Sequence, residues 1–100
     1  MSTIEVHKVI SMGFPPDEGK KLADHVLVTV DPAEWGDITL DVSQVPAGML
    51  IGAFYFNFLH RIWEHRADLL TRAKSITWQH TFGFQRDNSA GWIRDFQPNP

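Results

Sequence analysis

Ile38-Thr39-Leu40-Asp41-Val42-Ser43-Gln44-Val45 is the stretch of sequence that decides the fold. Residues 38–42 alternate apolar and polar side chains, which predicts a strand with one buried face. Pro46 and Gly48 predict a loop directly after it. A mostly apolar run then begins at Met49, so the centre of the chain predicts a strand, a short loop and a long packed element.

The run from Met49 to about Arg66 predicts a long helix. Phe54, Phe56 and Phe58 alternate with other residues and would also suit a strand. A strand of this span would exceed the usual length of about 3–10 residues, so we favour the helix. One side of that helix would carry Leu50, Ala53, Phe54, Asn57, Phe58, Arg61 and Ile62.

Two further elements precede this centre. Residues 4–10 alternate apolar and polar side chains as far as Val9 and predict an opening strand, which Gly13 and the Pro15-Pro16 pair end. Pro16-Asp17-Glu18 predicts a helix start, with the two acids beside the positive end of the helix dipole. We expect the helix to reach about Val28, although the β-branched stretch 25–30 leaves a strand as the alternative.

After the central helix, Ser75-Ile76-Thr77-Trp78-Gln79 alternates and predicts a third strand. Asn88 or Ser89 can cap a final short helix that runs through Phe96. The expected order is therefore β-α-β-α-β-α. It predicts an α/β fold in one small domain, with a parallel or mixed sheet and helices packed on it, over residues 1–97, and a tail at 98–100.

The composition excludes several classes of protein. The chain has 100 residues, 43% of them hydrophobic, a net charge of −3 and no cysteine. There is therefore no disulfide framework and no cysteine-based metal or haem site. The acidic charge disfavours nucleic acid. We expect no secretory signal and no membrane span, and hence a cytoplasmic protein.

The central motif resembles the STAS superfamily, and more specifically the small bacterial STAS-like domains of uncharacterised function. The residues that carry the resemblance are Ile38 to Val45, with Asp41, Ser43 and Val45 at the motif positions, followed by the apolar and aromatic helix. The resemblance covers roughly residues 15–96. It implies a STAS-like fold and regulation through a protein partner rather than catalysis.

One feature of the family is missing from this chain. STAS domains of the anti-sigma-factor-antagonist type are switched by phosphorylation of a serine at the start of the helix after the Asp-containing strand. That serine would fall near Met49, Leu50 or Ile51, none of which carries a hydroxyl. The phosphorylation switch therefore does not transfer to this chain, whereas the fold and the partner-binding role do.

Asp41, Ser43 and Gln44 are the candidate binding residues. They follow a strand whose carboxyl end is the position where open α/β sheets bind ligands. The alternative is that Asp41 accepts hydrogen bonds in a turn and that Ser43 bonds to the turn backbone. His7, His25 and His80 could converge in three dimensions, although their spacing does not predict it.

We expect no catalytic residue, no cofactor and no metal site. His60 and His65 are five residues apart, about 140° around a helix, and cannot easily bind one ion. His60 and Glu64 share a helix face, but two ligands do not make a site. The chain also lacks a phosphate-binding P-loop and a Gly-x-Ser-x-Gly nucleophile motif.

The central helix is apolar on nearly every side, more than one small core needs. We therefore expect Tyr55, Phe56 or Trp63 to lie in a contact with a second copy or with another protein. Two functions follow from the sequence. The first is a non-enzymatic interaction or regulatory domain. The alternative is a small-molecule-binding or catalytic domain with a pocket near Asp41 and Ser43.

Overall fold

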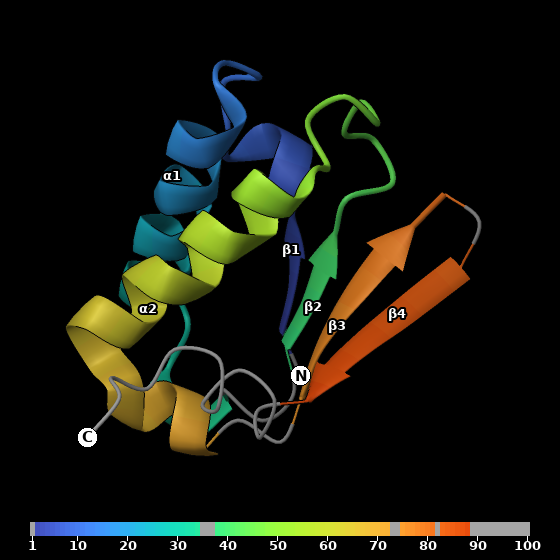
Figure 1. Ribbon diagram of the computed structural model, residues 1–100. Helices are drawn as coiled ribbons and strands as arrows, with labels where there is room; N and C mark the ends of the chain where they lie inside the picture. Colours follow the sequence, from blue (N-terminus) through green and yellow to red (C-terminus); the bar gives the residue numbers. More distant parts are fainter. Residues whose placement is uncertain (1, 35–37, 73–74, 82, 89–100) are drawn as a thin grey trace.

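Two long helices lie on the same face of a β-sheet (Figure 1). The computed structural model describes residues 2–34, 38–72, 75–81 and 83–88. Within these residues the sheet has four strands in the order β1-β2-β3-β4. The strands are β1 (Ser2–Glu5), β2 (Ile38–Asp41), β3 (Ser75–His80) and β4 (Gly83–Asn88), and the long helices are α1 (Pro15–Thr29) and α2 (Gly52–Arg72).

The sheet is mixed. β1 pairs in parallel with β2, β2 pairs in parallel with β3, and β4 returns antiparallel to β3. Each parallel connection passes through one of the two helices, because parallel neighbouring strands need a long crossover connection, which is usually a helix. The predicted α/β class with helices packed on a parallel or mixed sheet is confirmed.

The opening strand is shorter than predicted. β1 ends at Glu5, and Val6–Lys8 form a short 3-10 helix, so the prediction of a strand over residues 4–10 was wrong. Among the described residues β1 pairs with β2 alone, which has four residues, and the pairing ends at Glu5 opposite Asp41. Beyond that register the chain turns and places Val6 and Ile10 in the core.

The structure decides between the helix and the strand that the sequence allowed at residues 25–30. α1 continues to Thr29, because Leu22 and Val26 lie one turn apart on its buried side and only a helix places both in the core. The local β propensity is overridden by this packing. A second 3-10 helix, Pro32–Glu34, follows α1.

The second helix begins later and ends later than predicted. Turns occupy residues 46–51, where the Met49 N–H donates to the Pro46 carbonyl, and α2 starts at Gly52. It extends beyond the predicted end at Arg66 as far as Arg72. At Arg66 the backbone leaves helical geometry and the helix is kinked. The guanidinium of Arg66 donates two hydrogen bonds to the carboxylate of Asp68 at this kink.

The C-terminal part differs most from the prediction. Residues 83–88 form β4, a strand that the sequence did not predict. The hairpin turns over two residues between His80 and Gly83, and Gly83 has φ 153°, a backbone conformation that favours glycine. A glycine between two short alternating runs is a hairpin signal that the sequence contained. The predicted final helix over 89–96 and the tail at 98–100 lie outside the described residues.

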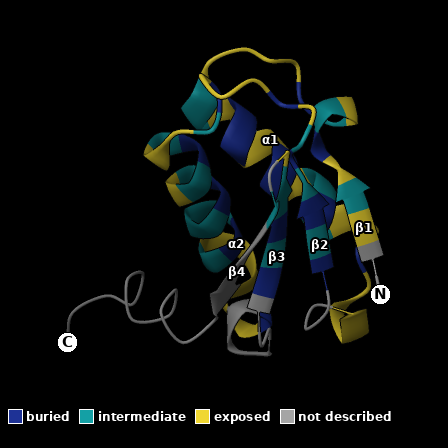
Figure 2. Cartoon of the chain, turned by 90° about the vertical axis from the view of Figure 1, so that its right-hand side faces the viewer, coloured by how far each residue is buried: buried dark blue, intermediate teal, exposed yellow. Residues whose placement is uncertain are grey.

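The core lies between the helices and the sheet (Figure 2). Phe54, Phe58 and Ile62 supply it from α2, as the predicted apolar side requires. Trp78 of β3 is at its centre and contacts the rings of Phe58 and Phe54 edge-on, at centroid distances of 5.4 and 6.5 Å. Such aromatic pairs add to the stabilisation that burial gives.

Gly19 lets the two helices approach closely. A Cβ atom at this position would overlap the carbonyl oxygen of Phe54 on α2. Farther along the same contact, the guanidinium of Arg61 on α2 donates to the carboxylate of Asp24 on α1 at 2.9 Å. The absence of a side chain at Gly19 therefore determines how α2, and every side chain on it, is placed.

Among the described residues, no helix is both long enough and apolar enough to cross a membrane.

Candidate functional site

The carboxyl ends of β1, β2 and β3 meet at one edge of the sheet (Figure 1). In the strand register, Asp41 lies between Glu5 and Gln79 in the last paired row. His7 and Ser43 follow the first two strands directly. This is the edge at which the sequence places a ligand or a partner.

Asp41 and Ser43 are bonded to each other. The Oδ1 atom of Asp41 accepts hydrogen bonds from the backbone N–H of Ser43 at 2.9 Å and from its hydroxyl at 2.6 Å. This is the turn arrangement that Asp and Ser commonly form. The Ser43 carbonyl in turn accepts a hydrogen bond from the Thr81 hydroxyl at 3.0 Å. These bonds connect the end of β2 to the end of β3.

The same contacts set the ionisation of Asp41. The hydroxyl of Ser43 and then its N–H hold the pKa of Asp41 below its ordinary value, and the electrostatic effect of the nearby His7 side chain acts in the same direction. Partial burial opposes them. Asp41 therefore carries its charge at neutral pH and uses one oxygen to hold the turn.

The other residues singled out from the sequence are Gln44 and the three histidines His7, His25 and His80. Gln44 is exposed. The Nδ1 atom of His7 is buried and has no hydrogen-bond partner among the described residues. His7, His25 and His80 do not form a metal site: in the part of the chain that is described, no three His, Asp or Glu side chains gather closely enough to hold an ion.

The solvent side of α2 carries a line of stacked rings. Phe56 is 55% exposed and stacks on His60 at a centroid distance of 5.7 Å. His60 stacks in turn on Trp63 at 6.5 Å. We call Phe56, His60 and Trp63 the outer stripe. His60 also pairs with Glu64, Nδ1 to Oε1 at 2.8 Å, and the two residues share a helix face as predicted.

The three predicted interface residues do not all lie on one surface. Phe56 and Trp63 belong to the outer stripe. Tyr55 is half-buried and turns toward the sheet, where its ring meets Trp78 edge-on at 4.9 Å. The other large exposed apolar side chains are spread over loops and helix ends: Met12, Phe14, Val28 and Ile51.

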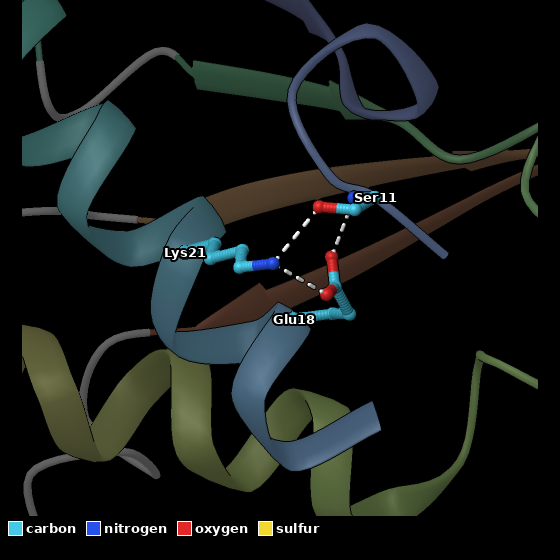
Figure 3. Close-up of polar contacts among 3 residues, drawn as sticks. All are labelled: Ser11, Glu18 and Lys21. Carbon is cyan, nitrogen blue, oxygen red and sulfur yellow. Dashed lines mark hydrogen bonds and ion pairs between the residues drawn. The ribbon is translucent and has the colours of Figure 1, made fainter. Parts of the chain in front are cut away.

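A buried carboxylate near the start of α1 is the feature that the sequence analysis missed. Glu18 is only 1% exposed. Its carboxylate accepts hydrogen bonds from the N–H of Ser11 at 2.6 Å and from the ammonium of Lys21 at 2.9 Å. Lys21 also donates to the Ser11 hydroxyl at 2.8 Å, so the side chains of Glu18 and Lys21 close a ring with the hydroxyl and the backbone N–H of Ser11 (Figure 3).

Burial acts to raise the pKa of Glu18, but the Lys21 ammonium and the backbone N–H groups of Ser11 and Gly13 outweigh it and lower the pKa. Glu18 therefore fastens the loop before α1 to the helix. From its place in the first turn, Glu18 is predicted only to interact with the helix dipole. Its burial could have been predicted from spacing, because Glu18, Leu22 and Val26 recur every four residues on one side of the helix.

Comparisons of the chain with models of protein families, with curated proteins and with solved structures found no match.

Proposed function

We propose that the chain is a non-enzymatic protein-interaction domain whose binding surface is the outer stripe of α2. The observation that carries the proposal is the exposure of Phe56 in line with two stacked rings on the solvent side of a helix that is otherwise anchored in the core. The resemblance to STAS-like domains, which act by binding partners, supports the same function.

Aromatic side chains on a protein surface favour association. Phe56 exposes most of a large apolar ring to water, and covering such a ring stabilises a complex. Phe56 also points away from the buried side of α2, where Phe54 and Phe58 form the core. A partner that covers this ring would therefore leave the packing of Phe54 and Phe58 in the core unchanged.

The partner to which the proposal commits is a second copy of this chain. Two copies related by a twofold axis present the same stripe to each other. With the two α2 helices antiparallel, Phe56 of each copy stacks on Trp63 of the other, and offset or edge-on ring pairs of this kind are favourable. His60, between the two rings, lies closest to the axis.

The alternative function is a small-molecule site near Asp41 and Ser43. One observation favours it, namely the buried Nδ1 atom of His7, which has no hydrogen-bond partner among the described residues. We rank it second because Oδ1 of Asp41 already accepts both donors of Ser43. A ligand that used these groups would have to break the turn that holds the end of β2.

Light scattering of the full chain over a wide range of concentrations tests the proposal. We expect the mean mass to rise with concentration from 11.4 kDa toward twice that value. Phe56→Ser should remain at the monomer mass. The matched control is Val28→Ser, which removes another exposed apolar side chain from a helix, at 85% exposure, and should associate like the parent.

Two results would contradict the proposal. In the first, the parent chain stays at the monomer mass at every concentration. In the second, Phe56→Ser and Val28→Ser weaken association equally, which would indicate nonspecific hydrophobic association rather than a defined binding surface.

A further inference from the structure

We infer that residues 11–14, which precede α1, form a docking loop for a segment of another protein that combines apolar and acidic side chains. We call these residues the α1 loop. Two of its side chains are large, apolar and exposed, Phe14 at 69% and Met12 at 38%. The inference is independent of the proposed function, because it concerns another part of the molecule and another kind of partner.

The backbone of the α1 loop is held in an unfavourable conformation at Met12. Among the described residues, Met12 is the one non-glycine residue with a positive φ, at 58°. This left-handed conformation costs free energy for a residue that has a Cβ atom. The backbone N–H groups on either side of it, those of Ser11 and Gly13, both interact with the carboxylate of Glu18. The buried carboxylate therefore holds the loop in a shape that Met12 does not favour by itself.

The start of α1 fixes the other end of the loop. Phe14 directly precedes Pro15 and Pro16, the first two residues of the helix. A residue before proline is restricted to extended conformations, and Phe14 has φ −73° and ψ 123°. Its carbonyl accepts the N–H of Glu18 at 3.0 Å. The two exposed side chains therefore extend from a backbone that is held on both sides.

This combination of features points to recognition rather than to stability. An exposed ring at Phe14 adds little to the core, and both the conformation of Met12 and the burial of the Glu18 carboxylate cost free energy. A loop of polar residues without these features would avoid those costs. A loop that is already rigid, however, loses less conformational entropy when a partner covers its side chains.

The charges beside the loop indicate the chemistry of the partner. The ammonium of Lys21 donates to the Ser11 hydroxyl and lies against the loop (Figure 3). Its side chain is 51% exposed, whereas that of its partner Glu18 is 2% exposed, so a partner meets the cation and not the carboxylate. Lys20 is exposed as well, and Asp17 is the one exposed acid in the first two turns of α1.

A partner segment with carboxylates beside its apolar side chains is complementary to this surface. An anionic lipid surface suits the loop less well, because the chain carries a net charge of −3 and two side chains insert little apolar surface. The partner to which the inference commits is therefore an acidic, apolar protein segment.

Selection of a random peptide library on phage against the full chain tests the inference. We expect the recovered peptides to combine large apolar residues with Asp or Glu. Their dissociation constants, measured by fluorescence anisotropy, should be at least about tenfold higher for Phe14→Ser. The matched control is Val28→Ser, which removes an exposed apolar side chain near the other end of α1 and should bind like the parent.

Met12→Gly separates recognition from stability. Glycine suits a positive φ, so the melting temperature should not fall, whereas loss of the side chain should weaken peptide binding several-fold. Circular dichroism confirms that each variant is folded.

Several results would overturn the inference: either Phe14→Ser or Met12→Gly binds the peptides as tightly as the parent, the recovered peptides are basic, or no peptide is recovered. Peptides that lose affinity in Phe56→Ser instead would bind the outer stripe and would also overturn it. Binding of the chain to vesicles of phosphatidylcholine and phosphatidylserine that is lost in Phe14→Ser would assign the loop to a lipid surface instead.

Discussion

The two sides of α2 carry similar residues and have different roles. On the buried side, Phe54 and Phe58 are fully enclosed and meet Trp78, and the helix is fixed there by Gly19 of α1. On the solvent side, Phe56 stacks on His60 of its own helix and is more than half exposed. Aromatic content alone does not distinguish the two sides. The difference arises from what each side faces.

The difference between the two sides explains why the apolar residues of α2 suggested both a core and an interface. A small domain needs large apolar side chains to build a core, and α2 supplies them from one side. On the other side, Phe56 is more than half exposed, and Trp63 packs only at the margin of the core. We therefore expect substitutions on the buried side to change stability, and substitutions on the outer stripe to change association.

The largest loss of stability should follow Phe58→Ala. The side chain is fully buried against Trp78, so its removal costs the transfer free energy of the ring and leaves a cavity. We expect the free energy of unfolding to fall by about 3–5 kcal/mol. Urea denaturation followed by circular dichroism measures it, and a loss below 1 kcal/mol would place Phe58 outside the core.

Gly19→Ala should have the next largest effect. The added methyl group has no space, because it would overlap the backbone of α2 at Phe54, so the helices must separate. We expect a loss of about 3 kcal/mol, the upper part of the range for overpacked sites. Elsewhere in a helix the same change is normally stabilising. A rise in the melting temperature would therefore contradict the helix contact.

The dependence of stability on acid pH tests whether the carboxylates of Glu18 and Asp41 stabilise the fold. The folded-state pKa values of Glu18 and Asp41 lie below their ordinary values of 4.5 and 3.8. Their contribution to stability is thus fully present above about pH 4.5 and is lost as the pH falls through the folded-state values. Glu18→Gln should cost roughly 2 kcal/mol at neutral pH and flatten this loss. An unchanged acid profile in Glu18→Gln would argue against the ring with Lys21 and Ser11.

The smallest effect is expected at the ion pair on the outer stripe. His60 and Glu64 are close to half exposed, and such pairs contribute little in water. Glu64→Gln should change the free energy of unfolding by less than about 0.5 kcal/mol. Comparison with Glu18→Gln under the same conditions contrasts a surface pair with one whose carboxylate is buried. Equal losses in the free energy of unfolding for the two variants would contradict the conclusion that Glu18 is buried and Glu64 exposed.

The sequence predicted the elements whose local pattern agrees with their packing. Ile38 to Asp41 alternates cleanly and is a strand, and the run through Phe54, Phe58 and Ile62 is a helix with those residues inside. Val6 to Ile10 failed because a strand also needs a partner, and β2 is too short to provide one. The length of a neighbour in space cannot be read from the local pattern.

The candidate site was predictable to a similar degree. The position of Asp41 at the end of a strand followed from the alternation, and its bond to Ser43 followed from ordinary turn chemistry. The enclosure of Glu18 did not follow, because it depends on the loop at Ser11 folding back over α1. That Tyr55 faces the sheet whereas Phe56 faces solvent did not follow from the sequence either, because it depends on the position of Trp78 on β3.

Two-dimensional amide NMR spectra of the parent chain at increasing concentration test most directly whether the outer stripe is the binding surface. We expect shifts and broadening to concentrate on the outer stripe, around Phe56, His60 and Trp63, and to be absent in Phe56→Ser. Changes that concentrate instead at Asp41 and Ser43, or on the helix-free face around Thr39 and Thr77, would contradict it. A spectrum that does not change with concentration would contradict it as well.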